Sequence, residues 1–226
     1  MRRDKKRDAD MLYLLLAALF IAALVTCNLI ANKFITVDLG FKSFIISAGV
    51  LPYPITFLIT DILSEIYGRK KTNAVVYAGL FASVFTLLIL YLGHQFPAIV
   101  GSPVGDEVYA TVFANSWRIV FASMVAYLFA QLVDIRLYHF WKKLTKGKHL
   151  WLRNNGSTIL SQLIDSALVV FVLFAGVKST SEMGDIIADG WMFKAGCALL
   201  DTPLFYLSVF AIRRYFGLKG HQELSY

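Results

Sequence analysis

Apolar blocks of about 20 residues recur along the chain and are separated by short charged stretches. An α-helix rises ~1.5 Å per residue, so about 20 residues cross the ~30 Å hydrocarbon core of a bilayer. The sequence therefore predicts an all-α, polytopic membrane bundle of six transmembrane helices that forms a single domain over residues 1–226. The expected spans cover residues 11–31, 46–67, 72–93, 118–141, 156–177 and 191–214.

The composition excludes most other classes of protein. Hydrophobic residues make up 58% of the chain and charged residues only 16%, against ~45–50% and about a quarter in soluble domains. No segment between the expected spans exceeds about 25 residues, which is too short to build a soluble domain with its own core. The membrane bundle and its short loops must therefore carry the function.

Basic residues are distributed unevenly between the expected loops. Sixteen of the 22 Lys and Arg residues fall in clusters that a six-span topology places on one side, within residues 2–7, 69–71, 142–153 and 213–219. The loops on the other side are acidic and contain Asp106, Glu107, Glu182, Asp185 and Asp189. Because Lys and Arg are retained in the cytoplasm, we expect both termini to be cytoplasmic. The net charge of +7 does not indicate nucleic-acid binding, since aromatic residues do not interleave with these clusters in a patch.

Neither a disulfide framework nor a metal site is expected. Cys27 and Cys197 both fall within spans, and the four His residues show no ligand spacing. The apolar run that follows the N-terminal basic residues is long for a signal peptide, so we expect a retained first helix. Residues 33–45 are expected to form a short hairpin on the periplasmic face.

Acidic and amide side chains occur inside the expected spans. An ionised side chain at the centre of a bilayer costs ~2.5–3.5 kcal/mol on insertion scales, so these groups must face a hydrated cavity, a partner or each other. They are Asp61, Glu65, Asp134, Asp165, Asp201, Asn28, Asn32, Gln131 and Gln162.

Helical spacing places these groups on shared faces. Phe57 and Asp61 are four residues apart, and Tyr127, Gln131 and Asp134 follow steps of four and three. Most of the spans thus present one polar stripe each, which predicts a common interior. Gln and Asp recur three residues apart in the fourth and fifth spans, which indicates either a trace of an inverted repeat or a coincidence.

Local pairing is the alternative for some of the acids. Glu65 lies four residues before Arg69 and either pairs with it at the interface or faces the interior. Asp201 lies on the same stripe as Lys194 and is a candidate partner for it.

Two long motifs resemble a known family. They are PYPITFLITDILSEIYGRKK at residues 52–71 and KGKHLWLRNNGST at residues 146–158. Both are similar to the YhhQ-type queuosine precursor transporters, which are grouped with the vitamin uptake transporters, and the resemblance extends from the first span to the sixth. It implies a multi-pass protein of the bacterial inner membrane, without enzymatic activity or a cofactor, that imports 7-cyano-7-deazaguanine and 7-aminomethyl-7-deazaguanine for tRNA modification.

The polar residues of the spans suit such a substrate. A deazaguanine presents a ring N–H beside an exocyclic amine, and one carboxylate accepts both, while an amide donates to the ring carbonyl. We therefore expect the path to be lined by acids and amides, with two aromatic stacking residues and two amides nearer the outer mouth. These candidates are, in that order, Asp61, Glu65, Gln131, Asp134, Gln162, Asp165 and Asp201, then Phe57 and Tyr127, then Asn28 and Asn32.

Energy coupling and assembly stay open at this stage. Titratable acids in a cavity suit coupling of transport to protons, whereas a facilitator needs no such acids. The size of six spans also resembles the substrate-binding components of energy-coupling-factor importers. A homo-oligomer and an energy-coupling module are both open as partners besides the substrate and the lipid bilayer. The alternative function is an intramembrane hydrolase with paired buried acids, although no span carries a Gly-x-Gly-Asp motif.

Overall fold

Long helices dominate the computed structural model. It describes residues 3–31, 33–38, 40, 43–114, 117–174, 176, 179–219 and 222–224. The long helices among these residues are α1 (Arg3–Leu29), α2 (Tyr53–Ile66), α3 (Gly68–His94), α5 (Trp117–Leu144), α6 (Leu150–Phe174) and α7 (Thr180–Phe216). Shorter elements are β1 (Phe34–Asp38), β2 (Ser43–Ser47), η1 (Ala48–Val50), α4 (Asp106–Tyr109) and η2 (Ala110–Ala114).

Five segments of the described chain are long and apolar enough to cross a membrane. They are Lys5–Leu29, Ala48–Ile66, Gly68–His94, Leu150–Val172 and Thr180–Phe216. The predicted all-α membrane bundle is confirmed to this extent. The span expected at 118–141 coincides with α5, but for residues 117–123 of this helix the structure describes the backbone alone. Six crossings and a single domain therefore stay predictions.

Local signals explain where two helices begin and end. The side chain of Ser179 accepts from the backbone N–H of Glu182, whose side chain bonds back to Ser179, and this capping box starts α7 at Thr180 rather than near residue 191. α2 ends at Ile66, and α3 follows almost directly because Gly68 adopts φ of +78°. Glycine reaches this conformation without strain, which permits the abrupt turn between the two helices.

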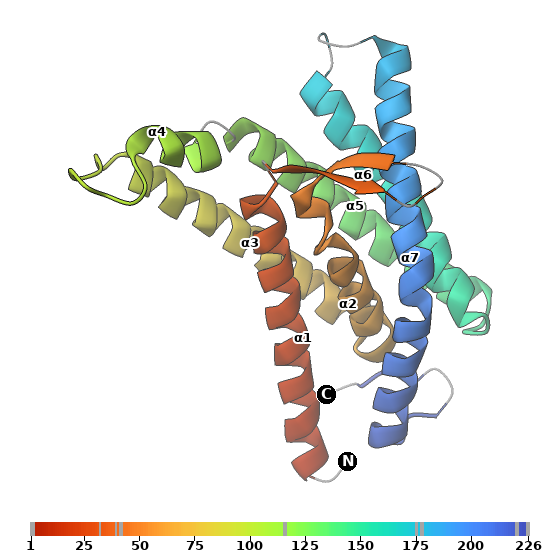
Figure 1. Ribbon diagram of the computed structural model, residues 1–226. Helices are drawn as coiled ribbons and strands as arrows, with labels where there is room; N and C mark the ends of the chain where they lie inside the picture. Colours follow the sequence, from red (N-terminus) through yellow and green to blue (C-terminus); the bar gives the residue numbers. More distant parts are fainter. Residues whose placement is uncertain are drawn as a thin grey trace.

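The expected hairpin is confirmed. β1 and β2 pair antiparallel, with Phe34 opposite Ser47 and Asp38 opposite Ser43. Figure 1 shows the hairpin on the side of α2 that is opposite to the chain termini.

Both ends of the chain lie at the same end of the bundle (Figure 1). Tyr215 Oη on α7 donates to Asp8 Oδ2 on α1 at 2.6 Å, and Lys5 Nζ donates to the carbonyl of Tyr215 at 2.9 Å. Near the C-terminus, the backbone N–H of Leu224 donates to the carbonyl of Ile66 at 2.7 Å. This arrangement suits an even number of crossings, and the cytoplasmic orientation of the termini stays a prediction.

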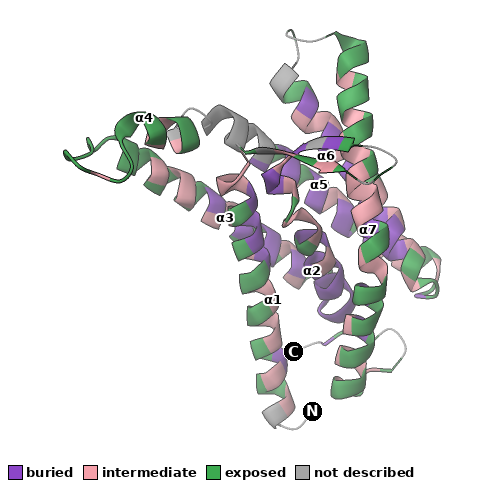
Figure 2. Ribbon diagram, in the orientation of Figure 1, coloured by how far each residue is buried: buried purple, intermediate pink, exposed green. Residues whose placement is uncertain are grey.

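α2 is the innermost helix. Nearly every residue from Thr56 to Ile66 is buried, and the helix packs against α1, α3, α5 and α7. Figure 2 shows the buried residues gathered around α2, with exposed residues along the outer faces of α1 and α7. The exposed outer side chains are large and apolar, as contact with lipid requires, and include Leu15, Phe81, Leu88, Leu200 and Leu207.

Candidate functional site

A pocket lies between α2, α6 and α7. Apolar residues of α2 and α7 contribute to its walls, and six polar or charged side chains line it: Asp61, Asn154, Thr158, Gln162, Lys194 and Asp201.

Contacts between α6 and α7 hold two walls of the pocket together. Asn155 Nδ2 donates to Thr202 Oγ1 at 2.9 Å, and Trp191 Nε1 donates to the carbonyl of Ile159 at 2.9 Å. These bonds fix how α7 is aligned along α6. The same alignment brings Lys194 and Asp201 to the pocket alongside Thr158.

Aromatic rings form the third wall. Tyr53 and Phe57 lie one helical turn apart on α2, with ring centroids separated by 5.3 Å, and both line the pocket. Tyr127 on α5 does not line it but packs behind, 5.4 Å from the Tyr53 ring and 6.1 Å from the Phe57 ring. Of the two predicted stacking residues, Phe57 therefore reaches the pocket and Tyr127 supports it.

Asp61 and Asp134 come together from α2 and α5. Their side chains interact directly, and both residues are buried. Hydroxyl groups of α6 approach the pair, with Thr158 Oγ1 3.4 Å from Asp61 Oδ2 and Ser161 Oγ donating to Asp134 Oδ1 at 2.9 Å. Asp61 faces the pocket, whereas Asp134 lies outside its lining.

Asp165 is neutralised by a lysine. Lys194 Nζ lies 2.6 Å from Asp165 Oδ2, 3.4 Å from Ser166 Oγ and 4.7 Å from the centre of the Tyr53 ring. The proposed pairing of Lys194 with Asp201 is thus replaced by a pair between α7 and α6. Asp201 remains half-buried and lines the pocket.

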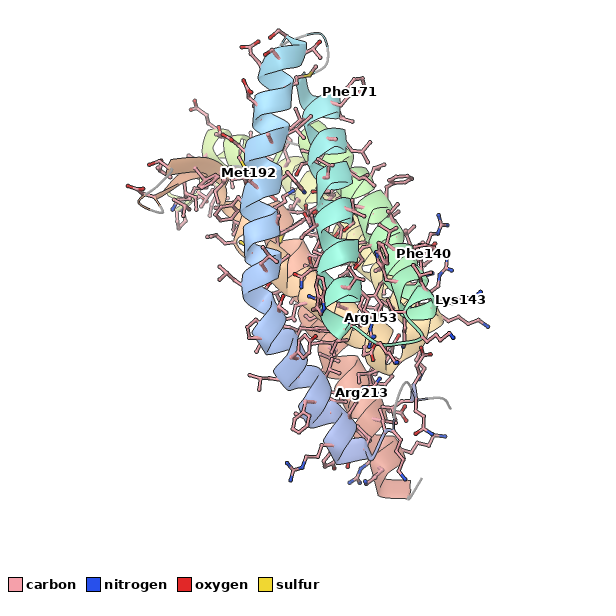
Figure 3. All side chains as sticks on the ribbon, turned by 90° about the vertical axis from the view of Figure 1, so that its right-hand side faces the viewer. Phe140, Lys143, Arg153, Phe171, Met192 and Arg213 are labelled. Carbon is pink, nitrogen blue, oxygen red and sulfur yellow. The ribbon has the colours of Figure 1, made fainter. Side chains whose placement is uncertain are left out.

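Glu65 belongs to a separate ion cluster near the chain termini. It is fully buried and receives Arg153 Nη2 at 2.8 Å, Arg153 Nε at 3.1 Å, Tyr138 Oη at 3.0 Å and Arg213 Nη2. Lys142 Nζ approaches to 3.7 Å. Figure 3 shows Arg153 and Arg213 toward the same end of the bundle, with Lys143 pointing away from the helices.

The partners of Glu65 correct the expectation from local spacing. The cations that bind it come from α5, α6 and α7 rather than from the neighbouring Arg69, which is exposed. The reason is that α2 is central, so its buried end faces three other helices. Glu65 does not line the pocket.

The two glutamines have different surroundings. Gln131 Nε2 donates to Tyr127 Oη at 2.7 Å and its Oε1 accepts from Thr60 at 3.3 Å, so both ends are bound by protein. Gln162 lines the pocket and is 2% exposed, yet its Oε1 has no partner among the described residues. Gln162 is therefore the amide of this pair that is free to bind a ligand.

Asn28 of the first span is not part of the pocket lining. Asn28 is near the end of α1, and its Nδ2 is buried without a partner in the described part of the chain. Asn32 lies outside the described residues.

Three of the six polar or charged lining residues are absent from the sequence-based candidates, namely Asn154, Thr158 and Lys194, and so is the aromatic Tyr53. Helical spacing contained the signal for Tyr53 and Thr158, since each lies one turn before a candidate on the same helix face. Asn154 required knowledge of how α6 is rotated. Within the residues that the structure describes, no three His, Cys, Asp or Glu side chains gather as metal ligands.

Comparison with known proteins places these features in a family. Residues 47–208 match the family model described as putative vitamin uptake transporter. The chain is similar to the probable queuosine precursor transporter of Bacillus subtilis (strain 168), with 28% identity over 159 residues, which cover 70% of this chain and 69% of the relative. No solved structure matches the chain.

Two further relatives are more distant. The queuosine precursor transporter of Escherichia coli (strain K12) is 25% identical over 144 residues, or 64% of this chain and 62% of the relative. The probable queuosine precursor transporter of Haemophilus influenzae is 23% identical over 157 residues, or 68% of this chain and 59% of the relative. The matches thus span less than two thirds of the length of these two relatives.

Proposed function

The chain belongs to the putative vitamin uptake transporter family, and we propose that it imports the queuosine precursors 7-cyano-7-deazaguanine and 7-aminomethyl-7-deazaguanine for tRNA modification. In this proposal it lies in the bacterial inner membrane with both termini in the cytoplasm. Membership in the family identifies a multi-pass membrane transporter rather than an enzyme. The intramembrane hydrolase considered from the sequence is left without support.

One observation carries the choice of substrate class. The pocket combines a carboxylate oxygen and an amide oxygen that are both buried and lack partners among the described residues, Asp61 Oδ1 and Gln162 Oε1. Buried acceptors without donors are costly, and a ligand rich in N–H groups removes that cost. The ring N–H and exocyclic amine of a deazaguanine are such donors.

The remaining pocket residues suit the rest of the heterocycle. The Asn154 amide supplies a donor for the ring carbonyl, and Phe57 offers an aromatic face to the planar ring. The two precursors differ at the 7-substituent, which is a neutral nitrile in one and a cationic aminomethyl group in the other. Asp201 has no cation partner in the described structure and is placed to balance the aminomethyl cation.

Complementation of cells tests this function directly. A strain that cannot synthesise the precursors and lacks its own carrier is supplied with one precursor, and the queuosine content of its tRNA is measured. We expect the wild-type chain to restore queuosine and Asp61→Asn to fail to do so. Asp185→Asn changes an exposed acid at the start of α7 and serves as the matched control that restores queuosine like the wild type. If the wild type does not restore queuosine, or if Asp61→Asn equals it at the same protein level, the proposal is wrong.

A further inference from the structure

Two of the four buried acids in the described chain have no cation. Glu65 is bound by Arg153 and Arg213, and Asp165 by Lys194. Asp61 and Asp134 instead lie next to each other, 2% and 0% exposed. Two neighbouring carboxylates in a region of low dielectric cannot both remain ionised at moderate cost.

The hydrogen-bonding pattern of the pair lacks one donor. Thr158 approaches Asp61 Oδ2 and Ser161 donates to Asp134 Oδ1, which leaves Asp61 Oδ1 and Asp134 Oδ2 buried without a partner in the part of the chain described here. A hydrogen on either carboxyl group supplies a donor to the other. The geometry thus fits a pair that holds one proton.

Most ionisable side chains around the pair already bind another side chain and therefore compete weakly for this proton. Glu65 on α2 and Tyr138 on α5 are titratable side chains close to the pair, and Lys194 and Asp201 on α7 line the pocket that Asp61 faces. Tyr138 donates to Glu65 at 3.0 Å, and Lys194 holds Asp165 at 2.6 Å. Asp201 is the remaining acid, has no hydrogen bond or ion pair among the described residues, and lines the same pocket as Asp61.

From this arrangement we infer that Asp61 and Asp134 form the binding site of a proton that is transported together with the precursor. The inference rests on the proposed import function and adds its energy source. The precursor binds an ionised Asp61 through two N–H groups, so the loaded state keeps the proton on Asp134. Binding of precursor and protonation of Asp134 therefore favour each other, as thermodynamic linkage requires.

The proton is conserved through the cycle. One proton passes from water on the outer side to the pair, and the same proton leaves for cytoplasmic water after the precursor has been released. Lys194 is bound to Asp165 but lines the same pocket as Asp61, so its positive charge lowers the cost of ionising the pair while the empty carrier returns.

Proteoliposomes that contain the purified protein test this role. With labelled 7-cyano-7-deazaguanine, which is neutral, we expect accumulation above the external concentration when the outside is acidic, loss of accumulation with a protonophore, and no effect of a Na⁺ gradient. We also expect influx to make a weakly buffered external medium more alkaline. This second measurement uses the wild type alone, so it does not depend on how a variant folds.

Asp134→Asn separates proton coupling from substrate binding. We expect this variant to exchange labelled for unlabelled precursor across the membrane but to lose gradient-driven accumulation by at least tenfold, while Asp185→Asn retains both. Normal accumulation by Asp134→Asn overturns the inference, and so does loss of exchange in a folded variant, which would place Asp134 in substrate binding. If the rate of uptake by the wild type does not depend on the pH gradient, or depends on a Na⁺ gradient, only the proton role is overturned. Absence of any uptake or exchange by the wild type overturns the import function as well.

Discussion

Arg153 Nη2 on α6 lies 2.8 Å from Glu65 Oε1 on α2, and Nε of the same guanidinium donates to Oε2 at 3.1 Å, although 88 residues separate the two positions. Such a two-point contact restricts the orientation of both side chains. Arg213 adds α7 to the same carboxylate. Tyr138 and Lys142 of α5 also contact this carboxylate, so the cluster joins four helices near the chain termini.

The first prediction concerns the stability that this cluster provides. Glu65→Gln leaves three cations facing one another around a neutral amide, and loss of one partner from a buried ion pair costs ~3–5 kcal/mol. We expect a clearly lower midpoint of thermal unfolding in detergent. Glu223→Gln is the control, because Glu223 is 39% exposed and its pair with Lys142 is at the surface, where such pairs contribute ~0–1 kcal/mol. Equal midpoints for the two variants would contradict the structural role of Glu65.

The pair between Lys194 and Asp165 predicts strong coupling between α6 and α7. Lys194→Met leaves a buried carboxylate without its cation, and Asp165→Asn leaves a cation beside an amide, so each variant should unfold at a lower temperature. The double variant removes both charges and should lose less stability than the sum of the two single losses. Additive losses in the four-protein cycle would show that the pair does not interact in the folded protein.

Close packing of α1 against η1 makes a third prediction. A Cβ atom added at Gly49 would lie 2.4 Å from the carbonyl oxygen of Cys27 and 3.2 Å from Ala31 Cα, and both are backbone atoms. Gly49→Ala should therefore displace the end of α1 and lower the yield of folded protein. Gly184→Ala is the matched control, since nothing lies within 4 Å of its added Cβ. Equal yields of monodisperse protein would refute the close approach.

The position of Asp201 in the pocket predicts that the protein distinguishes the two precursors. Asp201→Asn removes the charge that balances the aminomethyl cation but leaves the site for a neutral nitrile intact. We expect the apparent affinity for the aminomethyl precursor to fall about tenfold or more, since a hydrogen bond to a charged group contributes ~1.5–3 kcal/mol. Uptake of the cyano precursor should change little. The measurement is competition of each unlabelled precursor against labelled uptake, and an equal loss for both would remove Asp201 from this role.

Local periodicity was sufficient to predict part of the site. Phe57 and Asp61 share a face of α2 because residues four apart on a helix lie one above the other, and both line the pocket. The hairpin was expected at residues 33–45, which contain Asp38, Gly40 and Lys42, and its strands pair over residues 34–47. These features depend on neighbours in the sequence, which is why the sequence contains them.

Partners between helices depend on packing and could not be predicted. Asp165 finds its cation on α7, 29 residues away, because α6 and α7 are aligned by contacts that periodicity does not encode. Glu65 meets Arg153 rather than Arg69 for the same reason. The early start of α7 is a different case, since Ser179 and Glu182 form a capping signal that hydropathy alone overlooks.

Labelling of Cys197 tests the central claim that the pocket between α2, α6 and α7 binds the precursor. Cys197 lines this pocket, and Cys27 on α1 is buried and is not part of the lining, so a Cys27→Ser background leaves one thiol as the probe. The rate at which a small membrane-permeant maleimide labels Cys197 should fall when 7-cyano-7-deazaguanine is added and stay unchanged with adenine. A labelling rate that saturating precursor does not alter, in protein that still takes up the precursor, would contradict the account.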